Sequence, residues 1–177
     1  DFRIIAGQGT AVLELLEDQP DLDVILAPVG GGGLLSGTLV AAKAIKPQIR
    51  VIAVEPARVD DAYRSWKAGH IVENERIDTI ADGLRTNLGD KTFPIIRNLV
   101  DDIVLVEEDD IIHALRTVLE RMKIVIEPSS AVPLAALLSE RLDLSGQRVG
   151  VLIGGGNVDL DKLPRTETGE RPASAGR

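Results

Sequence analysis

Four short apolar runs constrain the fold of this chain more than any other feature. They are rich in β-branched residues and lie at Val24 to Val29, Val51 to Val54, Ile103 to Val106 and Val149 to Ile153. Near-continuous apolarity over so few residues is typical of strands that are buried on both faces. The segments between them favour helices, which we expect at Thr10 to Leu16, Leu34 to Ile45, Asp109 to Lys123 and Pro128 to Leu142. This alternation predicts an α/β fold of three layers, in which helices flank a mostly parallel, twisted sheet.

The expected helix from Asp109 to Lys123 has the clearest pattern. Its apolar residues fall on one stripe, and Glu107 to Asp110 place acidic side chains in its first turn, where they favour the helix dipole. His113 falls on the polar side of this stripe, and His70 stands alone in its stretch. Neither histidine is therefore a good catalytic candidate.

Charge and composition exclude several partners. The chain carries 28 acidic and 20 basic residues, for a net charge of −8, and only 2% of its residues are aromatic. Such a chain repels phosphate polymers and anionic membranes and lacks stacking platforms, so we expect a small-molecule partner, with no nucleic acid and no membrane. The sequence has no cysteine and no apolar run near the roughly 18 residues of a membrane span. These features favour a cytoplasmic protein.

The sharpest local motif is Gly30-Gly31-Gly32-Gly33-Leu34, which follows the first strand directly and opens a helix. Glycines there allow positive φ and close backbone approach, so that amide N–H groups converge on an anion beside the helix N-terminus. The motif therefore predicts a phosphate-binding loop, with a merely flexible turn as the alternative.

The identity of the phosphate ligand stays open at this point. Gly31-x-Gly33-x-x-Ser36 nearly completes a dinucleotide fingerprint, and Glu55 ends the next strand 22 positions after Gly33, where a ribose-binding acid would lie. A nicotinamide-binding Rossmann domain is therefore a competitor, although serine replaces the third glycine.

A second glycine cluster, Gly154-Gly155-Gly156-Asn157, follows the last strand. Ligands of open parallel sheets bind at the carboxyl ends of the strands. Two glycine loops at two strand ends therefore indicate one ligand that is held at two points.

Several motifs together resemble the pyridoxal-phosphate enzymes of the serine/threonine dehydratase and serine racemase group. They cover residues 4 to 162 and are, in order, Gly7-Gln8-Gly9-Thr10, Pro28 to Leu34, Glu55-Pro56, Ala81-Asp82-Gly83, Glu127-Pro128-Ser129 and Gly155 to Asp159. The resemblance implies the large domain of a fold type II enzyme. It assigns the cofactor phosphate to Gly30, Gly31, Gly32, Gly33 and Leu34. The position that usually holds a Ser or Cys facing the pyridine nitrogen is here Gly154.

The family also carries a lysine that binds the cofactor covalently, within an N-terminal Ser-x-Lys-x-Arg-Gly segment, and no such segment is present. Ser65-Trp66-Lys67 imitates its start, but no arginine follows, so we interpret Lys67 as a solvated lysine. We name no catalytic residue. We expect residues 1 to 163 to form part of a cofactor-binding large domain whose N-terminal part and small domain lie elsewhere. Residues 164 to 177 are expected to form a flexible tail.

The resemblance also implies a divalent cation site. Some members bind Mg²⁺ or Ca²⁺ through residues that correspond to Glu55, the backbone carbonyl of Val59 and Asp61, and hard oxygen ligands suit such ions. The alternative is that Asp60 and Asp61 cap the next helix while Glu55 is a solvated strand end.

The resemblance thus implies a pyridoxal 5′-phosphate-dependent ammonia-lyase that deaminates L-threonine or L-serine to a 2-oxo acid and is a homodimer when full length. This chain alone is expected to be inactive because the lysine is absent. Serine racemase is the alternative within the family, and a non-catalytic phosphate-cofactor-binding module is the alternative outside it. Asp82 and Glu127 lie near the active site in the family, but each fits a turn or helix-start role equally well.

Overall fold

A computed structural model describes residues 1–139, 141–159 and 161 of the chain. Within them, the strands are β1 (Val24–Pro28), β2 (Arg50–Pro56), β3 (Asp102–Val106) and β4 (Val149–Val151). They form one sheet in the order β3-β2-β1-β4, and each neighbouring pair is parallel. The predicted strands and their parallel arrangement are confirmed. The tail expected at residues 164 to 177 lies outside the described residues.

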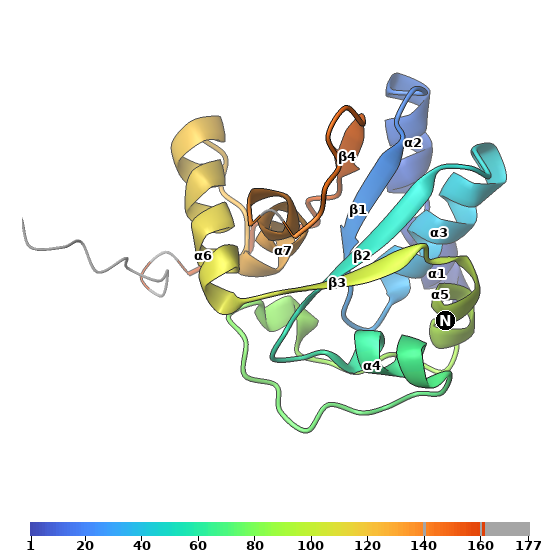
Figure 1. Ribbon diagram of the computed structural model, residues 1–177, viewed down its shortest axis with the longest axis horizontal. Coiled ribbons are helices and arrows are strands. Elements are labelled where there is room, and N and C mark those ends of the chain that lie inside the picture. Colours follow the sequence, from blue (N-terminus) through green and yellow to red (C-terminus); the bar gives the residue numbers. More distant parts are fainter. Residues whose placement is uncertain (140, 160, 162–177) are drawn as a thin grey trace, which may run out of the picture.

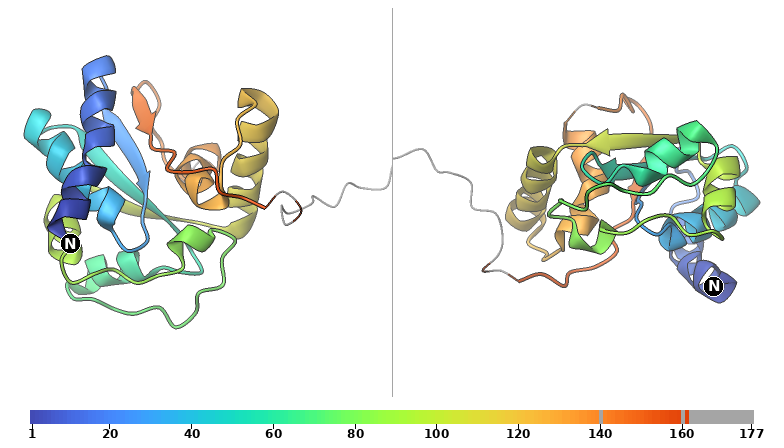
Figure 2. Two further views of the ribbon diagram at one scale, coloured as in Figure 1. Left: turned by 180° about the vertical axis from the view of Figure 1, so that it is seen from behind. Right: turned by 90° about the horizontal axis from the view of Figure 1, so that it is seen from below.

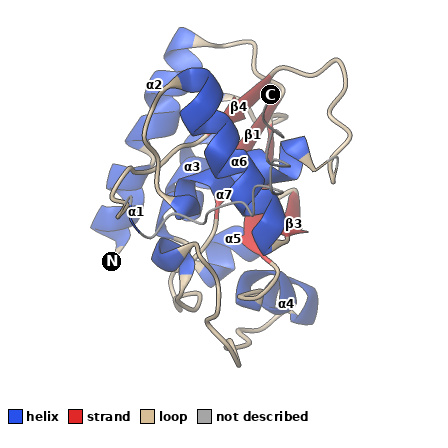
Figure 3. Cartoon of the chain, turned by 90° about the vertical axis from the view of Figure 1, so that its left-hand side faces the viewer, coloured by secondary structure: helices blue, strands red, loops and turns tan. Residues whose placement is uncertain are grey.

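Helices cover both faces of the sheet, so the three-layer α/β fold is confirmed (Figures 1 and 2). One face carries α1 (Phe2–Gln8), α2 (Thr10–Asp18), α3 (Gly33–Ile45) and α5 (Phe93–Leu99), with α4 (Asp61–Ala68) beside α5. The other face carries α7 (Pro128–Leu138), and α6 (Glu108–Thr117) packs on it, in front of α7 in the view of Figure 3. A short 3₁₀ helix, η1 (Asp82–Leu84), and a π-helical turn, η2 (Val118–Met122), complete the described elements. No described helix has both the length and the apolarity needed to cross a membrane.

The core explains the apolarity of the strands. All residues of β1 are buried, because its alternate side chains enter two different layers. Ile25 and Ala27 belong to the cluster that includes residues of α2 and α3, whereas Val24 and Leu26 belong to a cluster packed against Leu137 of α7.

Two predicted helices are wrong at their C-terminal ends. The helix expected from Asp109 to Lys123 changes to a π-helical turn after Thr117, and Lys123 ends it in the left-handed region, at φ 61°. Because a π turn holds more residues per turn, it rotates the last residues off the apolar stripe. Met122, expected on that stripe, is consequently 55% exposed. The last helix, α7, ends at Leu138 rather than Leu142.

The helices α1 and α2 pack on α3 through two glycines. A Cβ atom at Gly37 of α3 would lie 2.6 Å from the backbone nitrogen of Gly9, and it would also overlap the carbonyl oxygen of Ile5. A Cβ atom at Gly9 would lie 3.0 Å from the carbonyl oxygen of Gly37. The contact is therefore between backbones, and side chains would push the helices apart.

We predict that Gly37→Ala destabilises the fold by about 1–3 kcal/mol, since overpacking at a rigid backbone contact outweighs the helix propensity that alanine adds. Gly7→Ala is the matched control, because no atom lies within 4 Å of a Cβ at Gly7. Urea unfolding of both variants measures the difference. A Gly37→Ala protein as stable as Gly7→Ala would contradict the close contact.

Candidate functional site

The two glycine loops meet at one edge of the sheet. Because β1 and β4 pair in parallel, with Val24 opposite Val149 and Leu26 opposite Val151, both strands end on the same side. A pocket of about 230 Å³ opens there. Its lining includes all six residues that the sequence assigned to the cofactor: Gly30, Gly31, Gly32, Gly33, Leu34 and Gly154. Residues of η1 and of the start of α7 complete it.

The tetraglycine loop is fixed by its neighbours. Gly32 is the N-cap of α3 in the left-handed conformation, at φ 83°, which favours glycine. The hydroxyl of Thr92 donates a hydrogen bond of 2.8 Å to the carbonyl oxygen of Gly31. The loop thereby presents the N-terminus of α3, whose first N–H groups have no partner within the helix, to the pocket. Thr92 carries no sequence signal, since it acts from 61 residues away.

The start of α7 forms another part of the pocket wall. Ser129 and Ser130 line the pocket together with Glu127. A Cβ atom at Gly155 would lie 3.0 Å from Cδ of Glu127, so the carboxylate packs directly on the second glycine loop. The sequence singled out Glu127 but assigned no role to either serine.

The structure places the other residues that the sequence analysis discussed in different environments. Asp82 is exposed and accepts a hydrogen bond of 3.0 Å from the N–H of Gly83, and Gly83 rather than Asp82 lines the pocket. In the acidic cluster, Asp110 accepts a hydrogen bond of 3.3 Å from the N–H of Glu107, which agrees with a helix-start role. His113 is exposed, as its place on the polar side of the stripe predicts.

Lys67 lies on α4, outside the pocket lining. Its Nζ is 4.5 Å from the ring centroid of Trp66 and 5.4 Å from that of Tyr63, so it makes cation–π contacts at the surface. This place favours our interpretation of Lys67 as a solvated lysine. Among the described residues, no lysine lines the pocket.

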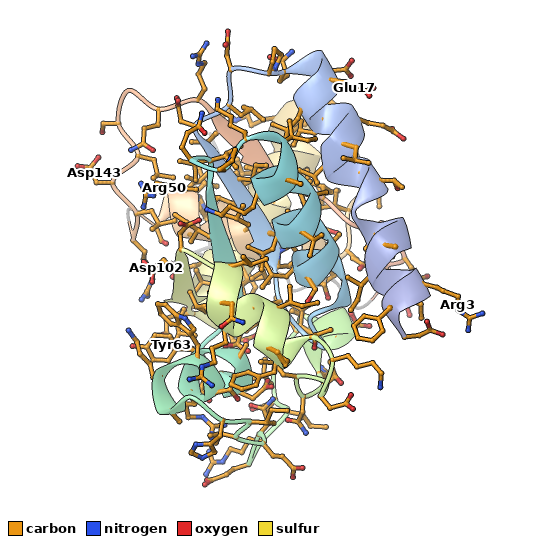
Figure 4. The ribbon with its side chains drawn as sticks, turned by 90° about the vertical axis from the view of Figure 1, so that its right-hand side faces the viewer. Arg3, Glu17, Arg50, Tyr63, Asp102 and Asp143 are labelled. Atoms are coloured by element: carbon orange, nitrogen blue, oxygen red, sulfur yellow. The ribbon has the colours of Figure 1, made fainter. Side chains whose placement is uncertain are left out.

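The predicted cation ligand Glu55 is not a solvated strand end. It is 1% exposed at the end of β2, and its two carboxylate oxygens accept hydrogen bonds from the N–H groups of Ala62 (3.0 Å) and Tyr63 (2.9 Å). Burial raises the pKa of Glu55 well above its ordinary value, and the charges of Asp61 and Asp60 raise it further. Figure 4 shows Tyr63 on α4, at the opposite end of the sheet from Arg50, where β2 begins.

Asp61 is equally buried, at 1% exposure. Its carboxylate accepts hydrogen bonds from the side-chain amide of Asn74 (2.6 Å) and the N–H of Leu88 (2.7 Å). Burial raises the pKa of Asp61 as well. No set of three metal-ligating side chains gathers within the part of the chain that the structure describes. Carboxylate and carbonyl oxygens are the ligands that a hard divalent cation prefers, although each carboxylate oxygen of Glu55 and Asp61 already accepts a hydrogen bond from an N–H group. The cation site stays a prediction.

The same contacts bear on the dinucleotide alternative. A ribose-binding acid must reach a ligand hydroxyl. Glu55 instead directs both oxygens at the first turn of α4 and is not among the residues that line the glycine pocket. The feature that favoured a Rossmann domain thus belongs to the packing of α4 against β2.

The fold and the site together define a phosphate-cofactor domain of the α/β class, with glycine loops at the carboxyl ends of two adjacent parallel strands. A model of the pyridoxal-phosphate dependent enzyme family matches residues 2–155, and the chain belongs to this family. The cofactor of the family is pyridoxal 5′-phosphate, which resolves the open choice of phosphate ligand.

Three relatives illustrate the similarity. The chain is 48% identical over 164 residues to β-hydroxyaspartate dehydratase of Paracoccus denitrificans, covering 93% of this chain and 52% of the relative. It is 50% identical over 171 residues to serine racemase of Dictyostelium discoideum, again covering 93% and 52%. The solved structure of a threonine deaminase from T.th. superposes with a TM-score of 0.84 at 48% identity, covering 88% of this chain and 58% of that one. The chain thus spans about half the length of the curated relatives it matches.

We predict that Gly32→Ala disrupts the phosphate loop. Its Cβ would lie 2.8 Å from atoms of Thr92 and Ile96, and the left-handed backbone adds strain. Gly33→Ala is the matched control, since the nearest atom to a Cβ there is 4.0 Å away. We expect Gly32→Ala to weaken binding of pyridoxal 5′-phosphate at least about tenfold, whereas Gly33→Ala changes it less. Calorimetric titration measures both, and equal affinities would contradict this geometry.

For the cation site, we predict that millimolar Mg²⁺ or Ca²⁺ raises the melting temperature and that Glu55→Gln abolishes this rise. Neutralising one carboxylate removes a hard anionic ligand. The matched control is Glu73→Gln, an acid outside the predicted ligand set. A melting temperature that does not respond to either cation, followed by scanning calorimetry, would contradict the cation site and leave the carboxylates with a purely structural role.

Proposed function

We propose that this chain is the cofactor-binding part of a longer pyridoxal-phosphate-dependent serine/threonine dehydratase, which converts L-threonine or L-serine to a 2-oxo acid and ammonia. The observation that carries the proposal is the single pocket that joins the Gly30–Gly33 loop to Gly154 at one edge of the sheet. It is supported by about 48% identity to proteins named as a dehydratase and a deaminase.

The chain's own residues bind and orient in this proposal. The N–H groups at the start of α3 and of the glycine loop hold the cofactor phosphate. Gly154 and Glu127 also line the pocket, and we propose that the cofactor ring lies against them. A Cβ at Gly154 would have its nearest neighbour, Leu34 Cδ2, at 3.9 Å, so packing does not exclude a side chain there. When bound, pyridoxal phosphate supplies an electron sink for the α-carbon of an amino acid.

The group that moves the α-proton is assigned to a lysine outside this chain. This proposal is supported by the sequence, in which we find no match to the family's lysine segment, and by the pocket, whose described lining contains no lysine. We propose that residues 1 to 163 act together with a further part of the protein, in a cytoplasmic homodimer.

Serine racemase is the second candidate. It is favoured by 50% identity to the serine racemase of Dictyostelium discoideum. Both reactions begin with removal of the α-proton and differ in whether the β-hydroxyl group leaves or a proton returns to the other face. The pocket residues described above serve both.

The experiment compares this chain with the full-length natural protein, whose intact mass is measured first. We predict that the full-length protein releases 2-oxo acid and ammonia from L-serine, L-threonine or β-hydroxyaspartate, whereas the 177-residue chain binds pyridoxal phosphate without turnover. A coupled 2-oxo acid assay and chiral chromatography of serine are the measurements. D-serine without 2-oxo acid would establish the racemase, and cofactor binding with neither product would establish a non-catalytic module.

A further inference from the structure

The first turn of α7 places two consecutive serines at the pocket. Ser129 and Ser130 are 4% and 1% exposed, and both belong to the pocket lining. Each hydroxyl bonds to a different backbone segment that forms part of the wall. A pair of small side chains on one helix turn therefore connects three elements that are remote in the sequence.

Ser130 holds the second glycine loop. Its Oγ accepts hydrogen bonds from the N–H groups of Gly154 (3.1 Å) and Gly155 (2.9 Å) and donates one to the carbonyl oxygen of Gly155 (3.0 Å). These bonds use the one donor and two acceptor positions of a hydroxyl group. The hydroxyl of Ser130 is therefore fully engaged in holding the loop.

Among the described residues, two backbone hydrogen bonds anchor the loop besides those of Ser130. The last bond of β4 to its neighbour β1 is donated by the N–H of Leu152 to Leu26. Beyond it, the carbonyl oxygen of Gly155 also accepts from the N–H of Glu127 (3.0 Å). A run of three glycines loses much conformational entropy on ordering, and Gly154 has no side chain of its own to contribute. Ser130 therefore makes three of the hydrogen bonds that order this segment.

Ser129 has the equivalent role on the other side of the turn. Its Oγ accepts a hydrogen bond of 3.0 Å from the N–H of Gly83, in η1. A Cβ atom at Gly83 would lie 2.9 Å from the same oxygen, so the contact requires glycine. The first turn of α7 thus fixes the Gly83 segment and the Gly154–Gly155 segment at once.

We propose that Ser130 is the positioning residue for the ring end of the cofactor, because it holds Gly154 and Gly155 at the pocket wall. This inference rests on the proposed function only in that the pocket takes pyridoxal phosphate. Ser130 does not touch the reacting atoms in this assignment and acts through the glycine loop. Among the described residues, no hydrogen bond of Ser130 reaches the Gly30 to Gly33 loop, so we expect the phosphate end to keep its position when Ser130 is replaced.

The test uses the 177-residue chain and pyridoxine 5′-phosphate, which has no aldehyde and forms no imine with surface lysines. Ser130→Ala leaves the N–H groups of Gly154 and Gly155 without their partner and removes one of the two hydrogen bonds to the carbonyl oxygen of Gly155, so we expect its Kd to rise about ten- to hundredfold. Ser139→Ala is the matched control at the far end of α7. Ser139 donates to the carbonyl oxygen of Ala135 there, and we expect the Kd of this variant to match that of the wild type.

Two spectroscopic signals distinguish a displaced cofactor ring from a general loss of order in the pocket. The phosphorus-31 shift of the bound ligand reports the phosphate end, and its ultraviolet absorption reports the ring. In Ser130→Ala at saturating ligand, we expect a changed absorption band and an unchanged phosphorus shift. Ser130→Cys, which keeps the side-chain shape but bonds weakly, is expected to show the same pattern with a smaller rise in Kd. The cysteine variant replaces the alanine variant in this test if Ser130→Ala does not fold.

An unchanged Kd in Ser130→Ala, or a phosphorus shift that changes together with the absorption, would overturn the inference while leaving the proposed cofactor in place. Absence of binding by the wild-type chain would instead contradict the proposed function itself.

Discussion

The parallel register of β1 between β2 and β4 is the constraint on which the rest of the structure depends. Because β1 is buried on both faces and pairs in parallel on both edges, the segments that follow β1, β2 and β4 leave the sheet at one edge. The tetraglycine loop and Gly154, the first residue of the second glycine loop, are thereby brought to one pocket. A register shift of one residue in β1 would exchange its two buried faces and separate α3 from the layer it covers.

Close backbone contacts then shape this edge. At Gly32, Gly83 and Gly155, a Cβ atom would come within 3.0 Å of a neighbouring side chain, and these neighbours belong to α5, α7 or the residues that begin them. Gly37 brings α3 equally close to the backbone between α1 and α2. The abundance of glycine therefore reflects packing between elements as well as the binding of an anion. A phosphate site that uses backbone N–H groups requires a backbone that other elements hold in place, and these contacts provide it.

The sequence predicted the features whose cause is local. A strand buried on both faces must be apolar, and a loop that places N–H groups at a helix start is rich in glycine, so β1 to β4 and the residues Gly30 to Leu34 could be identified. The short helices α1, α4 and α5 could not, because seven or eight residues span too few turns to show a period. Thr92, Ser129 and Ser130 were missed for another reason. Their partners lie 61, 46 and 24 to 25 residues away, and nothing in a serine or threonine alone indicates a distant backbone partner.

Buried acids link the periphery of the domain to the tetraglycine loop. Glu55 joins the end of β2 to the first turn of α4, and a second buried acid, Asp61, accepts a hydrogen bond of 2.7 Å from the N–H of Leu88. The residue after Leu88, Gly89, donates to the hydroxyl of Thr92 at 3.0 Å, and that hydroxyl donates to Gly31 at 2.8 Å. A carboxylate whose pKa is raised by burial is costly, because the folded chain must hold its charge away from water. The two buried acids lie where hydrogen bonds connect α4, the segment before α5 and the tetraglycine loop. The acids that the sequence marked for a cation thus also belong to the framework that holds the tetraglycine loop against α5.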